Sequence, residues 1–65
     1  MSNISKTLRK LREQKGLTQE KLARLADVSN NTVIKIDAGK NENPTLDTLK
    51  KLAKALDISV DDLIS

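Results

Sequence analysis

The sequence predicts an all-α fold, a compact bundle of five helices forming a single domain over residues 1–65. Apolar residues recur at helical spacing through almost the whole chain, and the breaks between apolar stripes carry residues that cap helices. The available core is aliphatic, since there is no Phe, Tyr or Trp, and no Cys is present to form a disulfide. So small a chain requires well-packed, well-capped helices. No internal repeat, linker or low-complexity tract is evident.

Helix ends are indicated by single residues. A Ser or Thr at the N-cap accepts a hydrogen bond from an orphan backbone N–H, and Gly favours the stop. Gly16 and Gly39 stand where the first and third helices are expected to end, and Pro44 closes the polar loop that follows. The second helix is expected over residues 19–26, and the third reaches about residue 38. The expected N-caps are Thr18, Ser29, Thr45 and Ser59.

Each expected helix has an apolar stripe that would face the core. The last helix carries Val60, Leu63 and Ile64, which form either a self-association surface or the closing part of the core. The other inward residues are expected to be Ile4, Leu8 and Leu11 in the first helix, Leu22, Ala23 and Ala26 in the second, Val33 and Ile36 in the third, and Leu46, Leu49, Leu52, Ala53 and Leu56 in the fourth.

Positive charge is concentrated in the first part of the chain. Residues 1–40 contain nine Lys and Arg against four Asp and Glu, whereas residues 41–65 contain three against five. This balance suits a polyanionic partner, although Lys and Glu are common on any small helical surface. No apolar run approaches the ~20 residues of a membrane span, and the first residues lack the apolar part of a signal peptide. We therefore expect a cytoplasmic protein with no membrane contact.

An enzymatic function is not expected. The chain has no His and no Cys, which removes the commonest general base, the strongest nucleophile and the commonest metal ligands. No glycine-rich phosphate loop is present, and so small a helical chain offers little room for a pocket. Single-stranded nucleic acid is also disfavoured as a ligand, because no aromatic side chain can stack on bases. The sequence therefore predicts no catalytic residue, no metal site and no cofactor.

The second and third helices are separated by only about three residues, the spacing of a helix-turn-helix. Ala23 would let the two helices cross closely, and Val33 would fill the same junction. Asp27 falls where the turn requires a positive φ, which Gly adopts best and Asp tolerates. A plain helical corner would have the same spacing, so this pattern alone does not establish DNA binding.

The outer face of the third helix carries the chemistry that reads DNA bases. Asn can bond to adenine N6 and N7 together, Lys reaches the acceptors of guanine, and an apolar side chain covers the methyl group of thymine. Asn residues are poor helix formers, and the alternative is that the pair serves as extra caps. The residues on this face are Asn30, Asn31, Thr32, Ile34 and Lys35.

The blocks LTQEKLA, VSNNTVIKIDAGK, NPTLDTLKKLAKAL and SVDDLI occur in order over nearly the whole chain. In these blocks and their spacing the sequence resembles the phage-repressor and Cro class of helix-turn-helix regulators, also called the xenobiotic-response-element family. The resemblance implies a lambda-repressor-like bundle whose helix-turn-helix unit spans residues 19–38. It also implies binding of double-stranded DNA through a recognition helix in the major groove.

The resemblance assigns roles to individual residues. Asn30, Asn31 and Lys35 occupy the base-reading positions, with Thr32 and Ile34 as secondary candidates. Gln19 is implied to bind a phosphate and to buttress the recognition helix. The hydroxyl of Ser29 would serve as a cap or as a phosphate contact. The other positions implied to bind phosphates lie in the loop after the third helix and are Lys40, Asn41 and Asn43.

Arg12 and Asp37 match a structural ion pair between the first and third helices of the family. Asp27 departs from the more usual Gly in the turn, and Asp37 departs from the more frequent Glu, whose longer side chain reaches Arg12 more easily. Were Asp37 too short to reach, Arg12 would be free to bind a phosphate instead.

The resemblance implies a transcriptional regulator, with repression favoured. The expected partner is a pseudo-palindromic operator, bound by a homodimer that forms in solution or only on DNA. An antitoxin that masks a toxin partner, with DNA binding for autoregulation, is the alternative from a different class, and a restriction-modification controller is a variant within the first. Fold alone does not separate these roles.

Overall fold

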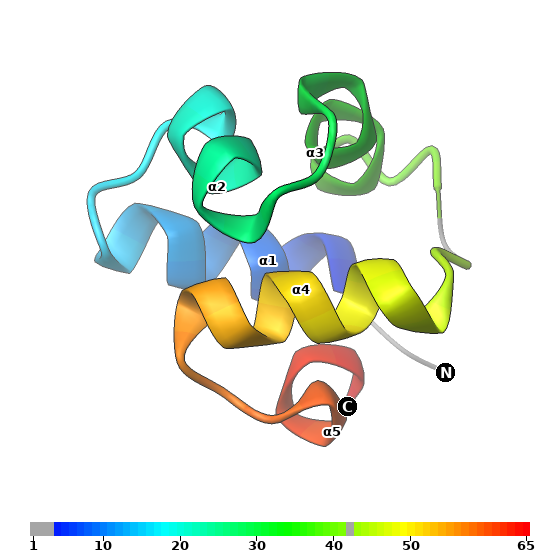
Figure 1. Cartoon of the computed structure of the whole chain (residues 1–65). Coiled ribbons are helices and arrows are strands. Elements are labelled where there is room, and N and C mark those ends of the chain that lie inside the picture. Colours follow the sequence, from blue (N-terminus) through cyan, green and yellow to red (C-terminus); the bar gives the residue numbers. More distant parts are fainter. Residues whose placement is uncertain (1–3, 42) are drawn as a thin grey trace.

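The computed structural model describes residues 4–41 and 43–65, and these two ranges form five helices (Figure 1). The all-α, five-helix prediction is confirmed. In Figure 1, α2 and α3 lie over α1, α4 crosses in front of α1, and α5 lies against α4. No helix within the described ranges is long and apolar enough to span a bilayer. The helices are α1 (Ile4–Gln14), α2 (Gln19–Ala26), α3 (Asn30–Asp37), α4 (Leu46–Leu56) and α5 (Val60–Ile64).

The core is one cluster of aliphatic side chains to which every helix contributes. Most predicted inward residues are buried, and Leu11 and Leu49 are partly buried against the core. Leu46 is 59% exposed, so its predicted burial is wrong. Leu46 is the first residue of α4, and Figure 1 shows the start of this helix at one end of the bundle. Buried apolar residues are Ile4, Leu8, Leu22, Ala23, Ala26, Val33, Ile36, Leu52, Ala53, Leu56 and Leu63.

The four predicted N-caps are confirmed. Each of Thr18, Ser29, Thr45 and Ser59 has extended backbone, and its hydroxyl oxygen accepts a hydrogen bond from the backbone N–H three residues later. The donor–acceptor distances are 3.0–3.2 Å. Each such cap stabilises its helix by about 1 kcal/mol, which matters in a domain without aromatic packing.

The α4–α5 segment repeats the backbone of the α2–α3 segment. Asp27 has φ 58° and ψ 45°, and Asp57 has φ 59° and ψ 44°. In both turns the next residue donates its N–H over 3.0 Å to the carbonyl of the buried Ala five positions earlier. Six of the fourteen residues in 21–34 are identical to the residue thirty positions later. The two segments therefore share a turn conformation, and the predicted positive φ of Asp27 is confirmed.

The two left-handed aspartates are expected to cost stability that glycine would recover, because an L-residue at positive φ is strained by its Cβ. We predict that Asp27→Gly raises the free energy of unfolding by about 0.5–1 kcal/mol and the melting temperature by several degrees. Circular dichroism at 222 nm during heating measures the melting temperature. Asp57→Gly is the matched control in the second turn and should behave alike; a Gly variant less stable than the parent would contradict the explanation.

Asp37 joins α3 to both preceding helices. Its carboxylate is buried and accepts hydrogen bonds from Gln19 Nε2 at 3.0 Å and from Arg12 Nε at 3.4 Å. Its backbone carbonyl, at the end of α3, accepts hydrogen bonds from Arg9 Nη2 at 2.7 Å and from Ser5 Oγ at 2.8 Å. The last turn of α3 is therefore fastened to α1 by its main chain and to α1 and α2 by a side chain.

Asp37 is long enough to reach Arg12, although the contact is long for a hydrogen bond. Arg12 also donates from Nη1 to the carbonyl of Leu17 at 2.8 Å, so its guanidinium bridges α3 and the loop before α2. A second guanidinium lies close, since Arg9 Nε is 3.5 Å from Asp37 Oδ2. The carboxylate is thus compensated from two turns of α1 and from the start of α2.

Replacing Asp37 by Ala should leave the guanidinium of Arg12, which is 14% exposed, without its counter-charge. Breaking a buried pair from one side costs about 3 kcal/mol or more, a large part of the stability of a domain this size. We therefore predict a strongly lowered urea midpoint. Arg24→Ala, which breaks an exposed pair with Glu20, is the matched control and should change the stability by no more than about 0.5 kcal/mol. A loss at Asp37 as small as the control's would show that the cluster does not hold the fold.

Candidate nucleic-acid interface

The turn between α2 and α3 sets α3 across α2. It consists of residues 27–29, with Asp27 in the left-handed conformation and Ser29 in extended conformation as the next N-cap. Ala23 on α2 is 3% exposed and Val33 on α3 is fully buried, as expected for side chains at a close helix crossing. α3 therefore has one face packed on α1 and α2, and its opposite face is open.

The open face of α3 carries the predicted base-reading residues. Asn30, Asn31 and Lys35 are exposed, and within the described ranges none of their side chains makes a hydrogen bond or an ion pair. Ser29 is the N-cap, so the Asn pair has no capping role here. The two amides and the ammonium are therefore available to a ligand, and both kinds of group can bond to base edges.

The two secondary candidates differ from each other. Ile34 is 39% exposed, so part of an aliphatic surface stands beside the polar groups. Thr32 is half-buried, and its Oγ1 lies 2.6 Å from Ser29 Oγ. The hydroxyl of Thr32 is thus engaged with the helix cap, whereas the apolar face of Ile34 is free.

Two of the residues predicted to bind phosphates make hydrogen bonds within the domain. Ser29 Oγ accepts the N–H of Thr32, and Gln19 Nε2 donates to the carboxylate of Asp37. Gln19 lies at the first position of α2, where exposed N–H groups and the helix dipole favour an anion. Its amide therefore lies between the anchored end of α3 and a helix terminus that can bind a phosphate.

The loop after α3 stays close to the recognition helix. The N–H groups of Lys40 and Asn41 donate to the carbonyl of Lys35 at 2.9 and 3.2 Å. Asn41 Oδ1 accepts the N–H of Asn43 at 3.2 Å, which shapes the loop. The side chains of Lys40 and Asn43 are exposed, so a cation and an amide follow the end of α3.

Sequence reasoning missed the roles of Ser5 and Arg9 in holding α3. Their spacing carried a partial signal, since Ser5, Arg9 and Arg12 recur at i, i+4 and i+7 and so lie on one face of α1. Which carbonyl this face would meet depends on how α1 crosses α3. That crossing is a tertiary feature and is not encoded in the local pattern.

A family model described as Helix-turn-helix matches residues 8–63 of this chain. The chain is 39% identical over 64 residues to the HTH-type transcriptional repressor RghR of Bacillus subtilis (strain 168). The matched region covers 98% of this chain and 47% of RghR. The chain thus spans about half the length of the curated relatives it matches.

Solved structures agree with this match. The restriction-modification controller protein C.AhdI from Aeromonas hydrophila superposes with a TM-score of 0.86 and 39% identity, over 94% of this chain and 91% of that one. SinR, described as the master regulator for biofilm formation and solved in complex with DNA, gives a TM-score of 0.88 and 30% identity, over 92% and 95%. The chain belongs to the helix-turn-helix family of phage-repressor and Cro type, and α2 and α3 form its DNA-binding helix-turn-helix unit.

Proposed function

We propose that this chain is the DNA-reading domain of a transcriptional repressor, in which α3 enters the major groove of an operator. The observation that carries the proposal is the state of the α3 face: Asn30, Asn31 and Lys35 are exposed and unengaged on a helix whose other end is held rigidly. Polar groups that are free but carried on a fixed helix lose little entropy when they bind base edges. The similarity to RghR, a repressor, supports the sign of regulation.

Affinity and specificity come from different residues in this proposal. Gln19, Ser29, Lys40, Asn41 and Asn43 contact phosphates, which fixes the position of the domain without reading sequence. The side chains of α3 then discriminate between bases, each good bidentate pair being worth about 1–3 kcal/mol. The Arg12–Asp37 pair contributes to both affinity and specificity indirectly, because it holds the orientation of α3.

A single α3 reads only a few base pairs, so the proposal includes a homodimer on a pseudo-palindromic operator whose half-sites lie about 34 Å apart. Leu63 is fully buried and closes the core, which leaves the half-buried Val60 and Ile64 as the apolar part of α5 near solvent. The site of action is the compartment that holds the DNA, the cytoplasm. The likeness to C.AhdI over most of its length supports a controller-type regulator as one form of this function.

Selection of bound duplexes from a random pool, at a stated salt concentration, tests the proposal. The wild-type protein should enrich a short, twofold-related sequence. Asn31→Ala and Lys35→Ala should each relax the preference at one or two positions by about 5–100-fold, because a bidentate or charged contact to a base is lost. Competition binding between the enriched duplex and its single-base variants measures this.

Lys40→Ala is the matched control for these variants, since it removes a phosphate contact. It should weaken all sequences about equally and reduce the slope of log K against log salt by about 0.9. If the α3 variants behave like this control, α3 does not read bases. If the wild-type protein enriches no sequence at all, the proposed function itself is wrong.

A further inference from the structure

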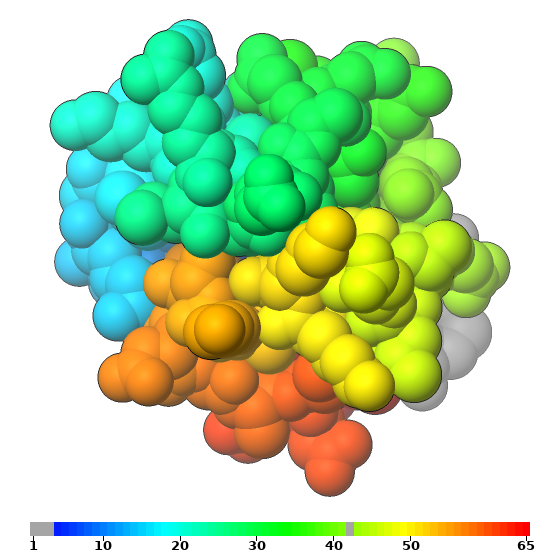
Figure 2. All heavy atoms as spheres, viewed as in Figure 1, coloured from blue at the N-terminus to red at the C-terminus, as the bar shows by residue number. Residues whose placement is uncertain are grey.

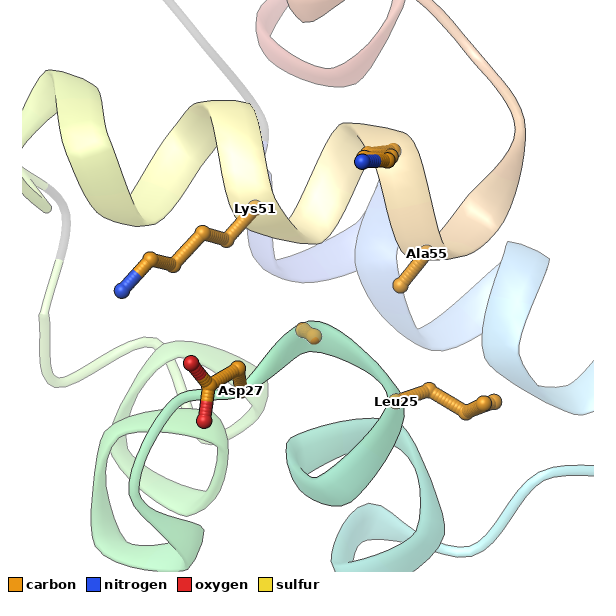
Figure 3. Close-up of a pocket in the computed structure, with 6 residues that line it drawn as sticks. Leu25, Asp27, Lys51 and Ala55 are labelled. Atoms are coloured by element: carbon orange, nitrogen blue, oxygen red, sulfur yellow. The ribbon is translucent and has the colours of Figure 1, made fainter.

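A surface hollow of about 460 Å³ lies between α2 and α4. Figure 2 shows the face on which it opens, where the teal and green residues of α2 and the following turn meet the yellow and orange residues of α4. In Figure 3, Asp27 and Lys51 lie toward one end of the hollow, and Leu25 and Ala55 lie toward the other. The lining residues are Leu25, Ala26, Asp27, Lys51, Lys54 and Ala55. None of these residues belongs to α3.

The apolar end of the hollow surrounds an uncovered leucine. Leu25 lies outside the buried stripe of α2 and is 62% exposed. Ala26 is buried and Ala55 is half-buried, so two short side chains line the hollow beside it. An outward position of a surface helix ordinarily carries a polar side chain, as Lys21 does one turn earlier on the same face of α2. An apolar side chain of a partner would remove Leu25 from water.

The charge of the hollow is positive. Lys51 and Lys54 line it together with a single acid, Asp27. Lys51 Nζ already lies 3.3 Å from Asp47 Oδ2 on the same helix. Lys54 is exposed and makes no ion pair within residues 4–41 and 43–65. Lys54 therefore supplies an ammonium group that a carboxylate of a ligand can reach.

The combination of leucine and lysine distinguishes a protein ligand from DNA. A phosphate backbone presents charge without large apolar groups, so it would satisfy Lys54 but leave Leu25 in water. An amphipathic helix presents both kinds of group, because its apolar side chains recur at i, i+3 and i+4 beside polar positions. Such helices bind in grooves with apolar walls. The hollow therefore suits an amphipathic helix whose polar positions are acidic.

We propose that the hollow between α2 and α4 binds an acidic amphipathic helix of a partner protein. An apolar side chain of that helix packs on Leu25 and Ala55, and a carboxylate on an adjacent turn pairs with Lys54. Because no lining residue lies on α3, the partner binds without covering the exposed face of that helix. The hollow thus places a second protein beside the DNA-binding unit. Binding of this partner does not depend on binding of DNA.

Titration with a designed peptide tests the proposal. The probe is a helical peptide of about 16 residues with capped ends, Leu at i, i+3, i+4 and i+7, and Glu at the flanking positions. Added to isotope-labelled protein and followed by NMR, it should shift the amide signals of Leu25, Ala26 and Ala55 most. The expected dissociation constant is about 0.1–1 mM, because the contact area is small. The same peptide with Lys in place of Glu should bind about tenfold more weakly or worse.

Two pairs of variants connect binding to the hollow. Leu25→Ala should weaken binding of the Glu peptide about fivefold or more, whereas Leu46→Ala, which truncates a 59% exposed leucine outside the hollow, should leave it unchanged. Lys54→Glu should weaken it about tenfold and improve binding of the Lys peptide, because the sign of the contact is reversed. Lys10→Glu on the exposed face of α1 should change neither. All four side chains are exposed, so each variant should keep the wild-type melting temperature.

Four outcomes would overturn the proposal. The first is no binding of the Glu peptide at several millimolar, with Lys54→Glu lowering the affinity for duplex DNA instead, which would make the lysine a phosphate contact. The second is equal binding to the wild type and to Leu25→Ala. The third is a shift of the Leu25 and Ala55 amides with protein concentration alone, which would place a second copy in the hollow. The fourth is displacement of the peptide by the selected duplex. A protein that selects no duplex but binds the Glu peptide as described would overturn the proposed function and support the partner site.

Discussion

The structure depends on one buried carboxylate, that of Asp37. A carboxylate that leaves water must regain its hydrogen bonds and counter-charge, or the folded state is destabilised. Here the compensation comes from Arg9 and Arg12 on α1 and from Gln19 at the start of α2, so satisfying Asp37 fixes both helices relative to α3. Because Asp37 lies in the last turn of α3, the fastening acts at the end remote from the Asn pair.

The rest of the fold is stabilised by a small aliphatic core and by capped helix ends. Eleven aliphatic side chains form the described core, and helix ends are secured by hydroxyl caps rather than by aromatic packing or cross-links. The order of a helix, a left-handed Asp and a Ser-capped helix occurs twice, with the two Asp residues thirty positions apart. The two versions differ in what the second helix exposes: α3 presents amides and a lysine, whereas α5 presents carboxylates. Two turns of the same backbone conformation are thus followed by helices whose exposed faces differ in charge.

Local features were predictable because their physics is local. The caps and the turn at Asp27 follow from side-chain hydrogen bonding and backbone sterics within a few residues. The exposure of Leu46 was missed because periodicity shows which face of a helix is apolar but not where neighbouring helices stop covering it. The contacts of Ser5 and Arg9 with α3 were missed for a related reason, since they depend on a crossing between helices distant in sequence. The exposure of Asn30, Asn31 and Lys35 on α3 follows from the helical pattern and is seen in the structure. That these side chains read bases stays a prediction, because base reading is a property of the complex with DNA.

Amide hydrogen exchange followed by NMR in Arg9→Ala tests most directly the claim that the contacts of Asp37 hold the recognition helix. Arg9 is half-exposed, so its removal should leave the domain folded while α3 loses one of the two side-chain donors to its last carbonyl, the other being Ser5 Oγ. We expect exchange about tenfold faster for the amides of α3, with α4 unchanged, relative to the wild type and to Lys10→Ala. Exchange in α3 that stays at the wild-type rate, or that rises equally in all five helices, would contradict it.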